Sequence, residues 1–340
     1  MAAVKASFFD AFAGVGGFRL AFEREGFECV GWCEIDEWCQ KLYRYYYEPD
    51  GEYFKADILA IDPGELPDFD IITAGIPCQP FSYAGKRRGL KDERGLLLWL
   101  AFFDIVRVKR PKVVLVENVR GLLSSRGGRD FAWVLLQMAR LGYSVEWCVL
   151  NSKDFGVPQN RERVFVVGHS GGECPAKVFP LEEGDKIRYT PPRKASEEGA
   201  RLWDSSGVRR ATDANYGKGG GSRTHIAVFD PYNRRLPRDQ SAVTALRTND
   251  RNGNAWIVEL RGVKIRIRKL TPLECFRLQG FPDDIVRAAR KLGISDTQLY
   301  KMAGNAVTVP VAQSIARKLK KVVFSPQNRT LCESKAFVGV

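Results

Sequence analysis

The sequence predicts an α/β fold: a Rossmann-like, mostly parallel sheet with helices on both faces, plus a smaller loop-rich domain. Three observations predict it. Apolar strand-like runs alternate with amphipathic helical ones through about residue 170, which is typical of such a sheet. A glycine turn at residues 14–17 follows the first run, and after about Gly171 the composition shifts to Gly, Pro, Arg and Ser. The chain is therefore expected to comprise three parts: residues 1–172, 173–267 and 268–340.

The strands are expected where β-branched and aromatic residues cluster between turn residues. They are residues 7–12, 28–33, 70–74, 113–116, 145–150 and 164–168. A helix is expected to follow the glycine turn, and a last helix to cover residues 309–320. Another should begin at Thr271, because Pro272 suits the first helical position and Glu274 completes a capping box.

Composition narrows the class of partner. Of 340 residues, 44% are apolar, which is ample for a packed core, and 53 Lys and Arg against 40 Asp and Glu give a formal charge of +13. Residues 186–269 hold 19 of the basic and 8 of the acidic side chains, so this one segment carries most of the excess positive charge. A polyanionic partner is therefore expected.

Other classes are disfavoured by what the sequence lacks. The longest apolar stretch, residues 96–103, is far shorter than the roughly 20 residues that span a bilayer, so no membrane partner is expected. The first residues have no apolar run typical of a signal peptide, and the eight cysteines match no zinc-site spacing. We expect a cytoplasmic protein with reduced thiols and no metal.

A thiol and a carboxylate are expected to share one pocket. Cys78 follows the run at residues 69–74, in a turn formed by Gly75, Pro77 and Pro80, and Glu117 follows the run at residues 113–116. Open α/β sheets carry their chemistry at the carboxyl ends of their strands. Cys78 is therefore placed as a nucleophile would be.

The glycine turn predicts a nucleoside ligand. Glycines let the backbone approach a ligand at a helix N-terminus, and Glu34, at the end of the second strand, has a spacing that suits a ribose hydroxyl pair. A dinucleotide such as NAD would fit this pattern almost as well.

Six blocks in order resemble the DNA (cytosine-5)-methyltransferases, which use S-adenosylmethionine. They lie at residues 10–17, 75–82, 117–119, 159–163, 268–282 and 304–307. The resemblance implies methyl transfer to C5 of a cytosine in a specific double-stranded DNA sequence. It also implies a catalytic and cofactor-binding domain at residues 1–172, a target-recognition domain at 173–267, and a return to the first domain at 268–340.

The resemblance also assigns the reacting groups. Cytosine C5 is a poor nucleophile, and adding the Cys78 thiolate at C6 would turn the ring into an enamine that attacks the sulfonium methyl. Glu117 would bind the exocyclic amine and N3. Arg163 would contact the carbonyl O2, and Arg161 would support Cys78.

Cofactor residues follow in the same way. Phe12 would stack on adenine, Glu34 would hold the ribose, and the turn containing Gly14, Gly16 and Gly17 would pass close to the methionine portion. Asp57 would lie near the adenine amine beside an apolar wall from Ile58. Asn305 and Val307 would close the methionine end. The product would be S-adenosylhomocysteine.

The target base must leave the duplex to meet Cys78. The residues implied to contact DNA are Gln79, Ser82, Lys86, Arg87, Arg88 and Thr244. The compact chain resembles a prokaryotic or phage enzyme, which would act as a monomer, either beside a separate restriction endonuclease or alone.

Three alternatives remain open at this point. The same chemistry on a tRNA cytosine is the nearest, and residues 80–82 with the long basic region favour DNA over it. A non-catalytic DNA-binding relative is disfavoured by the intact Cys78, Glu117, Arg161 and Arg163. An NAD-linked oxidoreductase is permitted by the glycine turn alone.

Overall fold

The structure of the protein, a computed structural model, describes residues 6–77, 93–171, 177–188 and 270–325, with the backbone of three short strands between them. The chain forms two compact units. The first comprises Met1–Leu150, Glu162–Ile187 and Val311–Val340, and the second comprises Asn151–Arg161 and Arg188–Pro310. The three-part division expected from the sequence stays a prediction, and these units divide the chain at other positions.

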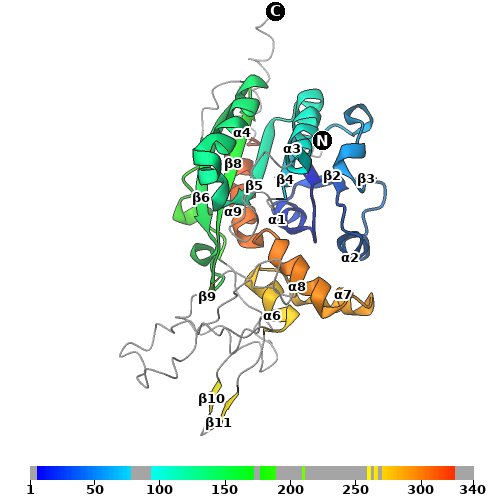
Figure 1. Cartoon of the computed structure of the whole chain (residues 1–340), viewed down its shortest axis with the longest axis vertical. Helices are drawn as coiled ribbons and strands as arrows, with labels where there is room; N and C mark the ends of the chain where they lie inside the picture. Colours follow the sequence, from blue (N-terminus) through cyan, green and yellow to red (C-terminus); the bar gives the residue numbers. More distant parts are fainter. Residues whose placement is uncertain are drawn as a thin grey trace, which may run out of the picture. The chain divides into compact units, whose positions relative to one another are not determined.

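The first unit is built on a seven-stranded sheet (Figure 1) in the order β3-β2-β1-β4-β5-β8-β6. The strands are β1 (Ser7–Ala11), β2 (Glu28–Cys33), β3 (Tyr53–Lys55), β4 (Ile71–Gly75), β5 (Val113–Val119), β6 (Tyr143–Asn151) and β8 (Glu162–Ser170). The neighbours from β3 to β5 pair in parallel, and β5 pairs with β8 antiparallel. The predicted mostly parallel α/β sheet is confirmed.

All six predicted strands are present, and β2 has the predicted bounds. The others differ by a few residues at their ends, where pairing with neighbours decides the length. The short edge strand β3 was not predicted. Its three residues carry too little pattern to distinguish a strand from a loop.

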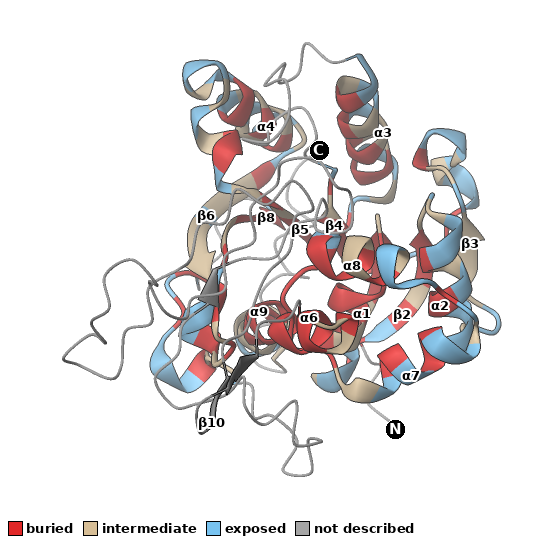
Figure 2. Cartoon of the chain, turned by 60° about the horizontal axis from the view of Figure 1, so that its bottom comes forward, coloured by how far each residue is buried: buried red, intermediate tan, exposed pale blue. Residues whose placement is uncertain are grey.

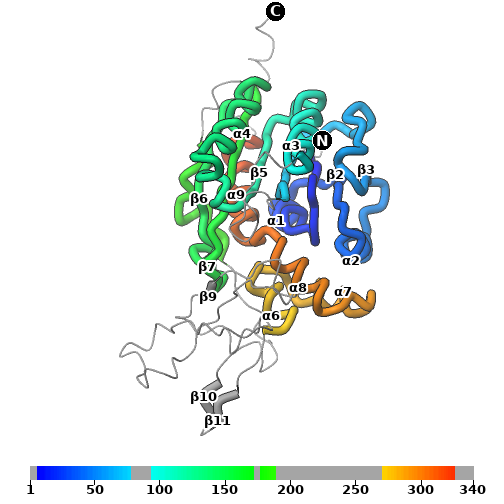
Figure 3. Tube along the Cα trace, in the orientation of Figure 1, coloured from blue at the N-terminus to red at the C-terminus, as the bar shows by residue number. Residues whose placement is uncertain are grey.

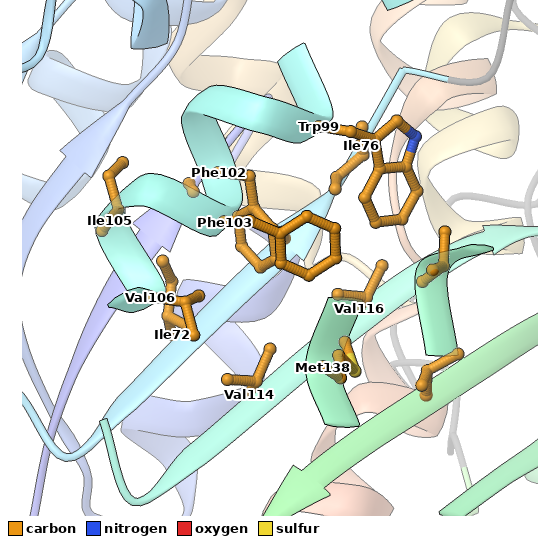
Figure 4. Close-up of a cluster of buried hydrophobic side chains, with 14 of the residues drawn as sticks. Ile72, Ile76, Trp99, Phe102, Phe103, Ile105, Val106, Val114, Val116 and Met138 are labelled. Carbon is orange, nitrogen blue, oxygen red and sulfur yellow. The ribbon is translucent and has the colours of Figure 1, made fainter. Parts of the chain in front are cut away.

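Helices cover both faces of this sheet. Phe8 of β1 packs against Phe22 of α1 (Gly17–Arg24), with ring centroids 5.3 Å apart. The next residue, Phe9, points to the opposite face and joins the main core. There Trp99 and Phe102 of α3 (Glu93–Lys109) and Met138 of α4 (Arg129–Arg140) join Val114 and Val116 of β5 in one buried cluster (Figure 4). Both helices have one buried and one exposed side (Figure 2).

The chain returns to the first unit through α9 (Val309–Val322), which confirms the helix predicted at residues 309–320. Glu25, at the end of α1, accepts hydrogen bonds from Gln313 at 2.8 Å and from Arg317 at 3.1 Å. The orange-red α9 therefore lies beside the blue α1 (Figure 3). Asp185 binds the same helix through Lys318 and Lys321.

The described residues of the second unit include three α-helices, α6 (Pro272–Leu278), α7 (Asp283–Lys291) and α8 (Asp296–Asn305). Thr271 and Glu274 form the predicted capping box at the start of α6. Short strands complete the described part of the unit: β7 (Gln159–Asn160), β9 (Arg209–Arg210), β10 (Glu259–Arg261) and β11 (Lys264–Arg266). β7 pairs in parallel with β9, and β10 pairs antiparallel with β11.

Among the residues that the structure describes, no helix is both long and apolar enough to cross a bilayer.

Candidate functional site

The carboxyl ends of five strands meet at one edge of the sheet. In register, Ala11 of β1 lies beside Cys33 of β2 and Ala74 of β4, and Gly75 lies beside Glu117 of β5. The residues that follow these strands include Phe12, Glu34 and Ile76. The edge therefore gathers the predicted cofactor residues of the first unit together with Glu117.

The glycine turn connects β1 to α1 at this edge. Gly14 and Gly16 have φ angles of 57° and 78°, a region that glycine enters without steric cost. Phe12 also has a positive φ, 58°, which is uncommon for a bulky side chain and often marks a functional turn. The N–H of Gly16 donates to the Ala13 carbonyl at 2.9 Å, and the N–H of Ala13 donates to the Cys33 carbonyl at 2.8 Å.

Helix α1 begins directly after this turn. Gly16 is its N-cap residue and provides no side-chain cap, and the first turn of the helix has no acidic side chain. Free N–H groups at a helix N-terminus attract anionic or electron-rich ligand groups. Apart from Gly14 itself and its two chain neighbours, no heavy atom of the described residues lies within 4 Å of where a Cβ of Gly14 would be. The turn therefore offers both donors and space for a ligand.

Glu34 ties the second strand to the glycine turn. Its Oε2 accepts the N–H of Gly14 at 2.7 Å, and its Oε1 accepts the N–H of Asp36 at 2.7 Å. Burial raises the pKa of the Glu34 carboxyl, although these backbone hydrogen bonds act in the opposite direction. Each carboxylate oxygen has two lone pairs, so both keep the capacity to accept a ribose hydroxyl.

Asp57 and Ile58 follow the next strand along the same edge. Lys55 of β3 lies beside Cys33 of β2, which brings the residues after both strands close together. Asp57 accepts the N–H of Leu59 at 3.0 Å and begins a short 3₁₀ helix, Ile58–Ala60. Ile58 is buried, with 3% of its surface exposed, and joins the main core. The arrangement is compatible with an apolar wall beside a polar group.

Glu117 and Arg163 form an ion pair, with the Arg163 Nε 3.0 Å from the Glu117 Oε1. They lie on the antiparallel neighbours β5 and β8, where Val119 is directly opposite Arg163. Arg163 also donates from Nη1 to the Glu162 carbonyl at 2.8 Å. The structure thus brings together two of the four residues predicted for catalysis.

Asn118 was not assigned a role from the sequence, but it holds the segment that leads to Cys78. It is buried, and its Nδ2 donates to the carbonyl of Ile76 at 3.2 Å, while its Oδ1 accepts the N–H of Val119 at 2.9 Å. Ile76 lies two residues before Cys78. The only sequence signal for Asn118 was its position after Glu117, an amide at the end of an apolar strand.

Several predicted residues lie outside the described part of the chain. They are Cys78, Gln79, Ser82, Lys86, Arg87, Arg88 and Thr244. Their assignments to catalysis and to DNA contact stay predictions.

Arg161, Asn305 and Val307 belong to the second unit. Arg161 is buried and donates to the carbonyls of Gly304 at 3.1 Å and Ala306 at 3.0 Å, so it holds the backbone on both sides of Asn305. Nearby, Thr308 exchanges hydrogen bonds with Ser152 at 2.8 Å and Gln279 at 2.9 Å. The expected support of Cys78 by Arg161, and the cofactor contacts of Asn305 and Val307, stay predictions.

A buried polar cluster lies beneath the glycine turn and was not predicted. Arg19 of α1 donates from Nη1 and Nη2 to both oxygens of Glu52 at 2.7 Å, and Thr73 donates to Asp10 of β1 at 3.0 Å. Burial, the largest effect, raises the pKa of Asp10 to about 8, although Thr73 and Arg19 act to lower it. An acidic residue inside the apolar run of β1 was the available signal for this cluster.

The fold and this edge define a Rossmann-like domain of the methyltransferase type. Solved structures share the fold, and two examples follow. The methyltransferase EhMeth of Entamoeba histolytica is 17% identical, with a TM-score of 0.64 over 93% of this chain and 98% of its own. The Dnmt2 methyltransferase of S. pombe is 18% identical, with a TM-score of 0.59 over 93% of this chain and 99% of its own.

The chain belongs to the C-5 cytosine-specific DNA methylase family, whose model matches residues 6–321. Two relatives extend the match. The Type II methyltransferase M.NlaX of Neisseria lactamica is 35% identical, covering 94% of this chain and 98% of the relative. The Type II methyltransferase M.HpaII of Haemophilus parainfluenzae is 36% identical, covering 93% and 89%. The protein is therefore a DNA (cytosine-5-)-methyltransferase, and use of S-adenosylmethionine follows from the family.

Proposed function

We propose that this enzyme methylates C5 of a flipped-out cytosine in one specific duplex sequence, with Cys78 as the nucleophile and S-adenosylmethionine as the methyl donor. The observation that carries the proposal is the ion pair between Glu117 and Arg163 at the sheet edge that also bears the glycine turn. A carboxyl group and a guanidinium at that edge suit the polar rim of a cytosine ring.

The reaction requires a nucleophile because C5 of the aromatic cytosine ring does not attack a methyl donor unaided. The Cys78 thiolate would add to C6, and the electron pair of the C5–C6 bond would become available at C5. The cofactor supplies an electrophilic methyl group on its sulfonium sulfur. Loss of the C5 proton to a base would then restore the double bond and expel Cys78 as a thiolate.

Glu117 and Arg163 would hold the ring during these steps. One Glu117 oxygen would accept from the exocyclic amine, and the other would share a proton with N3. Arg163 can donate to O2, where negative charge develops after thiolate addition. Support comes from their limited exposure, 12% for the Glu117 side chain and 19% for that of Arg163, because partly dry surroundings strengthen such interactions.

The first unit fits the proposed cofactor. Glu34 lies at the end of β2 with lone pairs left for ribose hydroxyls, and α1 presents a helix N-terminus without a side-chain cap. The space around Gly14 admits a ligand close to the backbone. Phe12 would stack on the adenine, with Ile58 as an apolar wall and Asp57 near its amine, and S-adenosylhomocysteine would be the product.

The partner proposals rest on charge and on the relatives. Residues 186–269 carry 19 basic and 8 acidic side chains, which suits contacts with the phosphates of duplex DNA. The named relatives are Type II methyltransferases of bacteria, so we infer a cytoplasmic, monomeric modification enzyme whose cognate restriction endonuclease acts separately. No metal is needed for the proposed steps.

The test is transfer of a tritiated methyl group from S-adenosylmethionine to mixed-sequence duplex DNA, followed by mapping of the methylated cytosines. A Cys78→Ala variant and a tRNA substrate serve as controls. We expect label at C5 in one sequence context, and its loss in the variant. Label in tRNA alone, or equal label in the Cys78→Ala variant, would contradict the proposal.

A further inference from the structure

The phenol of Tyr47 lies directly against the glycine turn. Its hydroxyl oxygen is 2.9 Å from the Gly16 carbonyl oxygen and 3.2 Å from that of Val15. Both partners are carbonyls, so the hydroxyl is the donor. A Cβ on Gly16 would lie 2.6 Å from the same hydroxyl oxygen, closer than two such atoms can approach. Gly16 and Tyr47 are thus fitted to each other.

This hydrogen bond fixes a peptide group of the turn. The Gly16 carbonyl also accepts the N–H of Leu20 at 2.9 Å, the first hydrogen bond of α1. In a trans peptide the C=O and N–H point in opposite directions. The N–H of Gly17 shares a peptide with the Gly16 carbonyl, so it points away from Tyr47 and out of the helix N-terminus, where a ligand would meet it.

The Tyr47 ring is itself held from two sides. The Arg19 guanidinium lies 4.8 Å from the centre of the Tyr47 ring and 5.1 Å from that of Tyr43. The two rings are 4.8 Å apart. Arg19 is only 4% exposed and forms a bidentate pair with Glu52 at 2.7 Å. Such a bidentate pair fixes the guanidinium plane, so Tyr47 keeps one position.

The hydroxyl also stays a donor over the working pH range. Burial is the largest effect on Tyr47 and raises the pKa of its phenol well above the usual value. The phenol is therefore protonated at neutral pH.

We propose that Tyr47 is a positioning residue for the cofactor: its hydroxyl holds the Val15–Gly16–Gly17 peptides in the orientation that receives the ligand of the glycine turn. The inference rests on the proposed function for the identity of that ligand. Tyr47 lies behind the turn and touches its backbone, so it acts through the turn and is not a catalytic residue.

The experiment compares Tyr47→Phe with the wild type and with Tyr45→Phe. Tyr45 is on the same helix, α2 (Glu37–Tyr47), and is 45% exposed, which makes it a matched control. Hydrogen exchange of the backbone amides from Val15 to Phe18 is measured in the protein alone. The dissociation constant for S-adenosylhomocysteine is measured by calorimetry, and KM and kcat are measured with a DNA substrate.

Tyr47→Phe loses one hydrogen bond. We therefore expect the exchange rate of these amides and the dissociation constant for S-adenosylhomocysteine each to rise about threefold to tenfold. KM for S-adenosylmethionine should rise in parallel, kcat at saturating cofactor should stay close to that of the wild type, and Tyr45→Phe should change none of these. A lowered melting temperature with an unchanged exchange rate and unchanged cofactor affinity would overturn the inference. Tyr47 would then stabilise the fold by packing alone and would not orient the glycine turn.

A double-mutant cycle gives a second readout. Gly16→Ala should be far more harmful to cofactor affinity in the wild type than in a Tyr47→Ala background, where the space for the methyl group exists. If the effects of the two substitutions on cofactor affinity were additive, Gly16 and Tyr47 would not be coupled, which would count against the inference. If the wild type bound neither cofactor nor product, the proposed function would fail, and the exchange rates would still decide whether Tyr47 holds the turn.

Discussion

The Nε of Arg163 lies 3.0 Å from the Oε1 of Glu117, and this pair joins two antiparallel strands at the edge where the parallel strands end. A partly buried carboxylate beside a guanidinium keeps one orientation, because the charge-assisted hydrogen bond is both strong and directional. Glu117 is thus held in place before any base arrives.

Replacing Glu117 with Gln tests its chemical role. The amide keeps the size of the side chain but cannot supply a proton to N3, so we expect kcat to fall about 10²-fold to 10⁴-fold, the range typical of a lost acid or base. Single-turnover transfer of labelled methyl measures the effect, with S-adenosylhomocysteine affinity unchanged.

The control for this variant is Glu162→Gln. Glu162, the first residue of β8, forms a more exposed ion pair with Arg120, which directly follows β5. The Arg120 Nη1 lies 2.6 Å from the Glu162 Oε2, and 41% of the Glu162 side chain is exposed. Such pairs contribute little to stability or rate. Equal activity of the Glu117→Gln enzyme and this control would show that Glu117 takes no part in the reaction.

Asn118 is expected to control the segment before Cys78. Asn118→Asp keeps an acceptor for the N–H of Val119 but loses the donor that binds the Ile76 carbonyl at 3.2 Å. An unsatisfied buried carbonyl costs about 1 to 3 kcal/mol, so urea unfolding should show a loss in that range, and methyl transfer should slow. Stability and rate equal to those of the wild type would mean that the Ile76 contact has no effect on the loop.

The sheet could be predicted because its strands carry their own pattern. β1, β2 and β5 are apolar runs between turn residues, and Thr271 with Pro272 and Glu274 marked the start of α6 by local chemistry alone. The antiparallel direction of β8 was not predicted in the same way. Direction depends on how the chain returns to the sheet, and residues within the strand do not encode it.

The site was predicted in part for a related reason. Glu34 directly follows β2 and Glu117 lies near the carboxyl end of β5, so the position of each at the sheet edge is a local property of the sequence. Tyr47 contacts Gly16 across 31 positions, and Arg19 meets Glu52 across 33. Nothing local marks Tyr47 among its neighbouring tyrosines, so only the packing of α2 against the turn reveals its contact.

Glu25 is expected to fasten the C-terminal helix to the first unit. Its carboxylate, with only 10% of the side chain exposed, accepts from Gln313 at 2.8 Å and from Arg317 at 3.1 Å. Glu25→Ala should lower the free energy of unfolding by about 1 to 3 kcal/mol, because hydrogen bonds to a charged group are lost. The exposed Glu28→Ala serves as control, and equal midpoints in urea for the two variants would contradict the expectation.

Asp10 predicts a pH dependence of stability with a definite sign. Burial raises the pKa of this carboxyl from 3.8 to about 8 in the fold. Between those two values the folded protein keeps the proton and the unfolded chain loses it, so stability falls as the pH rises, by at most about 1.4 kcal/mol per pH unit. Above about pH 8 the fall should level off, since both states are then ionised.

Asp10→Asn isolates this contribution. The amide is nearly isosteric with the protonated acid and keeps an acceptor for the Thr73 hydroxyl, now 3.0 Å from Asp10 Oδ1, but it cannot titrate. The free energy of unfolding in urea should be measured for both proteins between about pH 5 and pH 8. The difference, variant minus wild type, should grow as the pH rises, because the titration of all other groups cancels in it. Asp104→Asn, at a half-exposed ion pair on α3, should show a flat difference. A flat difference for Asp10→Asn as well would mean that Asp10 is ionised in the folded protein, with Arg19 as its counter-charge.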